Sequence, residues 1–535
     1  MKTSNNNDNS YLLPEQLTKK QFLETLKSSF IVKPIETTAG PFSLLESFEW
    51  SLYAHRIMAV RTNNQSISLW DEAHLFDDES ALEIDNINAR SKFWWDFPDP
   101  EVQQILKPIL KLRALHPVYQ GILRIEQLNL QNEDGKLLVH CQLISIFDTE
   151  YPRTPLMRQV KISPITGYAK EYKLANRLLN QLNPLKPSLS PLDTILGAIG
   201  VMPVPFNIKP QLKLPAKMPA RTAVSHIINT MISKQRMTEK GIIQDIDSEF
   251  LHHFRVAIRM VRAAIVQLKE VFPAQDVLIL KERFGNMARE TNKLRDLDVF
   301  IMDKARYMGL LPEPMRDDLL PMFTDFEKNR QIEAKRISRW IASRAYRDDI
   351  DELQAQFVHG YSAVETKWSE RPTIELAVSK IQKSYKKIYL AARKINSSTA
   401  DEKIHDIRID CKKLRYLLYF FGSEFDKKKM KQVANHLKSL QDKLGIFNDL
   451  TVQGDFLRNY LINLEHKPKK EIMLIAALGG LISTLYNMQV QEREKCIDEL
   501  AIFSNENNRL LFEETFAMKK KSAKQPKSRN KKFRS

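Results

Sequence analysis

At 535 residues the chain is too long for one ordinary hydrophobic core, and its length predicts about two to four domains. The net charge is +17, and the last 18 residues contribute nine Lys and Arg with no Asp or Glu, so the positive excess is concentrated at the end of the chain. Three widely spaced cysteines, Cys141, Cys411 and Cys496, argue against a disulfide framework or a cysteine-based metal site and favour a reducing compartment. The polar first ten residues lack the apolar core of a signal peptide, so we expect a cytoplasmic protein.

Residues 1–182 carry the patterns of an α+β domain. Strand-like segments flank two polar turns, at residues 62–65 and 132–135, and the second of these ends in Asp-Gly, a strong hairpin signal. The expected strands are Arg56–Val60, Ile67–Trp70, Gly121–Leu130, Lys136–Phe147 and Met157–Ile162, with a helix over Tyr168–Leu182. The sequence therefore predicts an antiparallel β domain with few helices.

Residues 183–220 contain eight of the 25 prolines. Because proline removes a backbone donor and breaks helices, we predict an extended linker here.

Residues 221–510 change to long helical patterns with almost no strand signal. The expected helices are Ser225–Ser233, Glu249–Val271, Val277–Lys293, Leu297–Met308, Pro321–Arg344, Ile350–Val358, Thr373–Lys394, His405–Phe421, Lys427–Leu444, Leu450–Leu464 and Ile472–Ala501. The apolar run from Ile472 to Met488 includes polar residues and glycines and is short for crossing a bilayer, so we interpret it as a buried helix.

Two helical segments carry a one-sided basic stripe. The first stripe is His252, Arg255, Arg259 and Arg262, and the second is His405, Arg408, Lys412 and Arg415. At about 100° per residue each set falls within an arc of roughly 80°. Like charges at this spacing repel one another, so two stripes of one sign predict a polyanionic partner.

A second motif repeats with the stripe. Predicted turns at Arg295–Val299 and Asn448–Val452 stand at the same distance from their stripes, so both features recur at an offset of 153 residues. This offset predicts a duplication, with repeats at about 221–395 and 396–510. Asp296 and Asp449 are most simply helix N-caps, and membership of the site, together with Arg295, is the alternative.

Residues 511–535 are predicted to be a disordered basic tail. The run from Lys519 to Arg534 has no apolar periodicity and could reach nucleic acid, polyphosphate or acidic lipid, or could serve only solubility.

The helical motifs resemble those of a known family. The stripe HxxRxxxRxxR, the segment LRDLDV, the second stripe HDIRIDCKKLRY and the segment LKSLQDKLGIFNDL (Leu437–Leu450) are similar to the two halves of a CHAD domain, the conserved histidine α-helical domain. The resemblance implies two pseudo-symmetric four-helix bundles whose basic surfaces bind inorganic polyphosphate. The ligands that it implies are the eight stripe residues, with Lys413 next in line.

The chemistry of the stripes agrees with such a ligand. Arg offers a planar fork for phosphate oxygens and Lys a mobile charge, while polyphosphate has no base edges to be recognised. A histidine inside a basic cluster loses its proton easily and regains it beside a polyanion, so we expect binding to strengthen below about pH 6.5. Counterion release should make binding weaken steeply with salt. His253 points about 100° away from the stripe, and Tyr416 is interpreted as a packing residue.

The first 182 residues resemble a CYTH domain less closely, through Leu44–Val60 and Ile162–Leu182. CYTH domains are antiparallel β tunnels, and some hydrolyse triphosphate with a divalent metal. The opening ExExK signature of that family is absent here, and Gln142 and Ser145 stand where a metal-binding strand would carry carboxylates. The resemblance therefore implies a degenerate CYTH-like domain, with Arg124, Glu126, Arg158 and Lys161 as the remaining tunnel candidates.

The leading hypothesis is a polyphosphate-binding protein without catalytic residues, metal or cofactor. A first alternative is an inorganic triphosphatase that uses Mg²⁺ or Mn²⁺ in the CYTH-like domain. A second is nucleic-acid binding through phosphates, disfavoured because neither stripe interleaves aromatic stacking residues. Association with polyphosphate granules and the oligomeric state are left open by the sequence.

Overall fold

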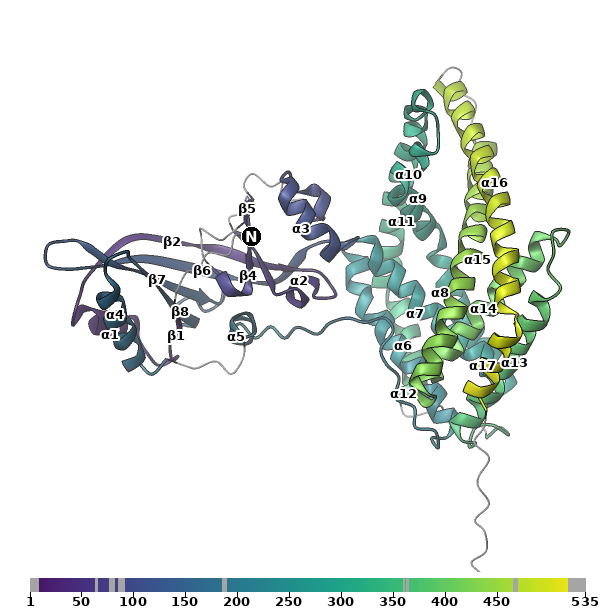
Figure 1. Ribbon diagram of the computed structural model, residues 1–535, viewed down its shortest axis with the longest axis horizontal. Helices are drawn as coiled ribbons and strands as arrows, with labels where there is room; N and C mark the ends of the chain where they lie inside the picture. Colours follow the sequence, from purple (N-terminus) through teal and green to yellow (C-terminus); the bar gives the residue numbers. More distant parts are fainter. Residues whose placement is uncertain are drawn as a thin grey trace, which may run out of the picture. The chain divides into compact units, whose positions relative to one another are not determined.

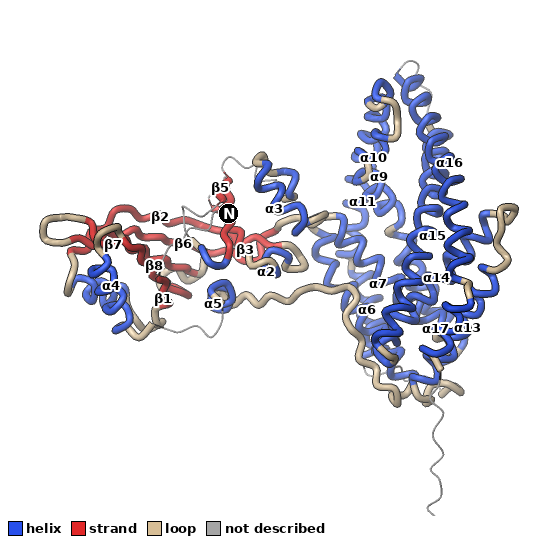
Figure 2. The backbone as a smooth tube through the Cα atoms, in the orientation of Figure 1, coloured by secondary structure: helices blue, strands red, loops and turns tan. Residues whose placement is uncertain are grey.

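The computed structural model describes residues 9–62, 66–76, 82–84, 92–184, 190–358, 361, 365–464 and 470–517. The chain divides into two compact units, residues 1–207 and 208–535. Unit 1 holds the strands and unit 2 is helical, as predicted (Figures 1 and 2).

Unit 1 is built on an antiparallel sheet of eight described strands. Their order is β1-β8-β7-β6-β2-β3-β4-β5. The strands are β1 (Asn9–Leu12), β2 (Ile31–Glu46), β3 (Ile57–Thr62), β4 (Ser66–Asp71), β5 (Leu82–Ile84), β6 (His116–Gln131), β7 (Leu137–Phe147) and β8 (Pro155–Pro164). The five predicted strands correspond to β3, β4, β6, β7 and β8.

Sequence patterns missed the longest partner of β6. Strand β2 pairs with β6 from Ile31 to Glu46, but it contains Pro34, Gly40 and Pro41, and most of its first ten residues are exposed. It therefore lacks the alternating apolar pattern that identifies a half-buried strand.

Helices cover both faces of the sheet. Helices α1 (Lys19–Lys27) and α4 (Ala169–Gln181) lie side by side over one face, where Leu128, Leu143 and Val160 form a core. On the other face, α5 (Pro191–Ala198) packs against Ile144 and Ile146. The short α2 (Ser51–Ala54) and α3 (Pro100–Leu110) enclose a third cluster.

Helix α5 corrects the prediction of an extended linker over residues 183–220. Ser190 caps the helix by accepting from the Asp193 N–H, and Pro191 occupies the first turn, where its missing donor costs little. Leu192, Ile195 and Leu196 are buried against the sheet. Proline at a helix start therefore promoted the structure that proline elsewhere would prevent.

Unit 2 consists of long helices. They are α6 (Ala220–Ile243), α7 (Ser248–Gln267), α8 (Ala274–Glu290), α9 (Asn292–Met302), α10 (Lys304–Gly309), α11 (Leu320–Ala342), α12 (Arg344–Val358), α13 (Thr373–Ala392), α14 (Asp401–Phe421), α15 (Lys427–Ile462), α16 (Lys470–Phe503) and α17 (Glu506–Thr515). Helices α13, α14 and α15 each begin 153 residues after α6, α7 and α8 respectively. The predicted duplication thus recurs in the helix starts.

The two predicted turns are wrong. Residues 295–299 lie inside α9, and residues 448–452 lie inside α15, which joins two predicted helices into one of 36 residues. Buried Leu444, Phe447 and Leu450 keep an apolar face continuous across the predicted break, so packing favours an uninterrupted helix.

The apolar run from Ile472 to Met488 is buried on one face only. Leu474, Leu478 and Leu481 of α16 enter a core shared with α9, α11 and α15, whereas Ile472 and Tyr486 are more than half exposed. Among the described residues, one helix, Ile472–Phe503, is long and apolar enough to cross a membrane by length and composition alone, which is weak evidence for a span. The predicted tail run from Lys519 to Arg534 lies outside the described residues.

Candidate functional site

The first stripe stands on the polar side of α7. Asp247 caps this helix by accepting from the N–H groups of Glu249 and Phe250. The apolar residues between the stripe positions, among them Val256, Ile258 and Val261, are buried as predicted. Packing of that side leaves Arg259 exposed and His252, Arg255 and Arg262 partly exposed.

The second stripe has the same placement on α14. Leu414, Leu417 and Leu418 are buried, while His405 and Arg415 are exposed and Arg408 and Lys412 are partly exposed. Helix α14 packs against α7, although more than 130 residues separate them in the sequence. The duplicated helices are therefore neighbours in space.

Electrostatic effects show that the two stripes share one region. Burial lowers the pKa of Lys412 to about 8, and the cations Arg408 and Arg259 act in the same direction, outweighing the opposite effect of Asp449. Arg259 belongs to α7, so a cation of the first stripe acts directly on a cation of the second. We call the eight stripe residues together the basic face.

Arg255 is held in place from below. Its guanidinium donates to the Ala288 carbonyl over 3.1 Å and to the Thr291 hydroxyl over 2.7 Å. Burial lowers its pKa to about 10, with Arg259 acting in the same direction. Its buried Nε finds no hydrogen-bond acceptor among the described residues, so this donor is left for a ligand or water.

Arg408 is the counterpart of Arg255 in the second half. One of its terminal nitrogens lies 3.4 Å from the Asp449 carboxylate, and its Nε, like that of Arg255, has no acceptor in the described structure. Burial lowers its pKa, and the nearby Asp449 opposes that effect. For Arg259, Arg262 and Arg415 the described residues provide no carboxylate ion pair. The basic face therefore holds more cations than the protein neutralises.

Asp296 and Asp449 are not N-caps. Asp296 lies in the second turn of α9 and Asp449 in the interior of α15. Burial raises the pKa of Asp296, while Arg255 and Arg295 lower it. Both carboxylates thus lie beside the equivalent arginines of the two stripes, which is the alternative that the sequence left open.

Lys209 is a member of the site that sequence reasoning missed. Its pKa is lowered by burial and by the charges of Arg415 and Arg259, so its ammonium lies near both stripes. The segment that carries it is fixed on the helices, because Tyr419 donates to the Pro210 carbonyl over 2.8 Å and Ser423 to the Leu212 carbonyl over 3.0 Å. A single lysine among prolines has no periodic signal by which it could be found.

Lys413 is not part of the basic face. It donates to Asp410 over 3.0 Å and lines a pocket between α13 and α14. At about 100° per residue it lies between roughly 80° and 160° from the stripe positions of α14. Tyr416 packs within 6.4 Å of Phe420, ring centre to ring centre, and Arg415 lies over its ring, so its packing role agrees with the prediction.

The tunnel candidates of unit 1 are engaged locally. Register places Arg124 opposite Ser145 and Ser145 opposite Arg158, on the face that also carries Glu126. Glu126 is paired with Lys19, and Arg158 donates to the Leu17 carbonyl over 2.7 Å. Lys161 lies opposite Gln142, outside this row. In the described part of the chain no three His, Cys, Asp or Glu side chains are grouped as metal ligands would be.

Comparison with known proteins agrees with the helical site. Residues 226–458 match the CHAD domain family, a range that contains both stripes. This chain carries a CHAD domain. The match ends before α16 and α17, which continue the second repeat.

Relatives beyond the family match are distant. Two uncharacterized proteins of Mycobacterium tuberculosis are each 26% identical over 291 residues, which cover 53% of this chain and 53% of theirs. The chain therefore spans about half the length of these curated relatives. Among solved structures, the CHAD domain from the plant Ricinus communis is similar at 21% identity and a TM-score of 0.47, over 56% of this chain and 96% of that one. PptA from Streptomyces chartreusis is similar at 11% identity and a TM-score of 0.40, over 53% and 99%.

Proposed function

We propose that the basic face of the CHAD domain binds inorganic polyphosphate without metal or catalysis. The observation that carries the proposal is the meeting of two duplicated stripes, in which Arg259 of α7 depresses the pKa of Lys412 on α14. Cations held this close repel one another, so the arrangement has a lower free energy with a polyanion present.

The shape of the site favours a phosphate chain over a single anion. Its guanidinium groups are supplied at successive helical turns on two neighbouring helices. A flexible chain with about one charge per phosphate can contact several of these groups at once and release counterions as it does so. The buried Nε atoms of Arg255 and Arg408 provide donors that are already desolvated and oriented.

The test is a titration of the full chain with long-chain polyphosphate. Replacing Arg255, Arg259, Arg408 and Lys412 together by Ala should weaken binding by about 100-fold or more, because each lost charge-assisted contact contributes about 1.5–3 kcal/mol in a desolvated site. A matched control removes four exposed lysines elsewhere in unit 2, Lys281, Lys328, Lys335 and Lys428, and should retain binding within about threefold. Equal losses in both variants would show that only net charge matters and would reject the site.

Competition with duplex DNA separates this function from nucleic-acid binding. At matched phosphate concentration and salt, polyphosphate should displace DNA at least tenfold more effectively than DNA displaces polyphosphate. The reverse order would assign the basic face to a nucleic acid.

For unit 1 we propose a CYTH-like sheet that has lost metal-dependent triphosphatase activity. Two observations support this. Glu46 is buried, and its carboxylate accepts from the N–H groups of Ser47, Leu52 and Tyr53 at 2.7–2.9 Å, so it caps α2. Glu126 is paired with Lys19. Release of phosphate from tripolyphosphate in the presence of Mg²⁺ or Mn²⁺ would contradict the proposal.

A further inference from the structure

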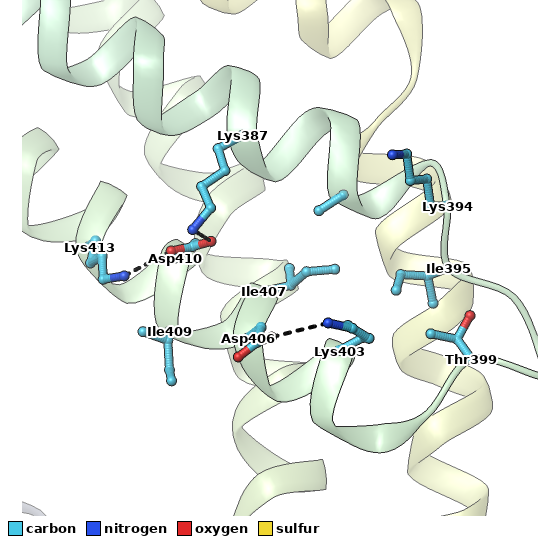
Figure 3. A pocket seen from close by; sticks show the side chains of 11 residues that line it. Lys387, Lys394, Ile395, Thr399, Lys403, Asp406, Ile407, Ile409, Asp410 and Lys413 are labelled. Carbon is cyan, nitrogen blue, oxygen red and sulfur yellow. Dashed lines mark hydrogen bonds and ion pairs between the residues drawn. The ribbon is translucent and has the colours of Figure 1, made fainter.

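A second basic cavity lies between α13 and α14, away from the basic face. It has a volume of about 600 Å³. Figure 3 shows Lys387 and Lys413 converging on Asp410, with Lys403 reaching toward Asp406. Lys394, Ile395 and Thr399 line the other end of the cavity.

The charges of the cavity are fixed by a buried carboxylate. Asp410 is 7% exposed and lies 2.7 Å from the Lys387 ammonium and 3.0 Å from that of Lys413. One carboxylate thus holds two ammonium groups at the same edge of the cavity and leaves one positive charge in excess. Lys403 and Asp406, 4.0 Å apart, are mostly exposed and balance one another.

The wall between these charged groups is aliphatic. Ala391, Ile395 and Ile407 line it, and Lys394 adds a further ammonium group. Counting four lysines against two aspartates, the lining carries a net charge of about +2 at neutral pH. A ligand that matches it needs both a multiply charged anionic end and an apolar body.

The first half of the duplication shows that this cavity is a specific feature of the second half. Moving back by 153 residues, Lys394, Lys403, Asp410 and Lys413 correspond to Gly241, Phe250, Ala257 and Met260. All four of the latter are buried. A Cβ atom on Gly241 would lie 2.2 Å from the Phe250 ring, so in the first half that ring fills the corresponding space between α6 and α7.

The cavity is separated from the basic face by the body of α14. The centre of the set Lys403, Asp406, Asp410 and Lys413 lies roughly 160° around the helix from the centre of the stripe. A phosphate chain on the basic face would therefore not occupy it.

We propose that this cavity binds a nucleoside polyphosphate, with the phosphates on Lys387 and Lys413 and the nucleoside on the aliphatic wall. The volume lies within the range of about 300–1,000 Å³ that is usual for small-molecule sites. Two or three phosphate charges complement the excess of lysines, and the apolar wall distinguishes such a ligand from bare phosphate chains.

The experiment is a fluorescence titration of the full chain with mant-ADP, an ADP that carries an N-methylanthraniloyl label on the ribose. Unlabelled ADP should displace the probe, and adenosine and tripolyphosphate should each compete at least tenfold less effectively. Equal competition by tripolyphosphate would reduce the cavity to a charge cluster, and equal competition by adenosine would reduce it to an apolar patch. Either result overturns the proposal.

Variants place the probe in the cavity. Lys387→Ala combined with Lys413→Ala should weaken mant-ADP binding about tenfold or more, through loss of two charge-assisted contacts. Ala391→Trp should block it sterically with every lysine in place. A control that removes the exposed Lys281 and Lys335 should bind within about twofold of the parent. Circular dichroism confirms that each variant is folded, and undiminished binding by Ala391→Trp contradicts the assignment.

Discussion

The depressed pKa of Lys412 predicts how polyphosphate binding depends on pH. In the free protein burial and neighbouring cations lower that pKa to about 8. A bound polyanion adds negative charge beside the ammonium, favours its protonated form and raises the pKa again. Binding is then coupled to proton uptake above pH 8, so the affinity falls as pH rises through about 8.

The expected magnitude follows from this pKa difference. If the ligand restores the ordinary lysine value of about 10.4, the affinity should fall about tenfold between pH 7 and pH 9, which is about 1.4 kcal/mol. This trend lies above the histidine effect expected below about pH 6.5, so the two are separable on one profile.

The measurement is a series of polyphosphate titrations at constant ionic strength between pH 6 and pH 10. Lys412→Arg is the matched control, because its guanidinium stays protonated throughout. The Arg variant should bind within about threefold of the parent at pH 7 and lose most of the decline between pH 7 and pH 9. An equal decline in parent and variant would refute the reasoning, because another group would then be titrating.

Three further predictions concern the two halves of the CHAD domain. Arg259→Ala combined with Arg415→Ala should reduce the slope of log affinity against log salt by about one to two, measured by titration from 50 to 300 mM salt, since each lost phosphate contact releases fewer counterions. Asp449→Ala should strengthen polyphosphate binding about two- to threefold by removing the negative charge beside the stripe, and should change the free energy of unfolding by less than about 0.5 kcal/mol; a loss near 1 kcal/mol would instead indicate an N-cap. Gly241→Ala should destabilise the fold by about 1–3 kcal/mol in a urea titration, because its Cβ would overlap the Phe250 ring, whereas Lys394→Ala at the equivalent position should be nearly neutral.

Local pattern predicted the strands and helices whose burial is periodic. Strands β3, β4, β6, β7 and β8 and the stripe-bearing α7 and α14 alternate buried and exposed residues with the period of their element, and that period can be read without knowing the neighbours. Strand β2 and helix α5 were missed or misread, because partners distant in sequence stabilise them against unfavourable local composition.

The predicted turns failed for a related reason. The segments around Asp296 and Asp449 carry residues typical of caps, but Phe300 and Leu450 are buried in the core that joins α9, α11, α15 and α16. Tertiary packing of this apolar face outweighs the local preference, and the two carboxylates become countercharges of the stripes.

The sequence by itself determined that this protein carries two basic helical faces at a constant spacing, since the period of an α-helix fixes which side chains share a side. Only the tertiary structure decided that the two faces meet, that Lys209 joins them from the proline-rich segment, and that Lys413 belongs to a separate cavity. The physical reason is that desolvation and repulsion between charges depend on distances through space. Those distances are set by the packing of helices that are more than a hundred residues apart in the chain.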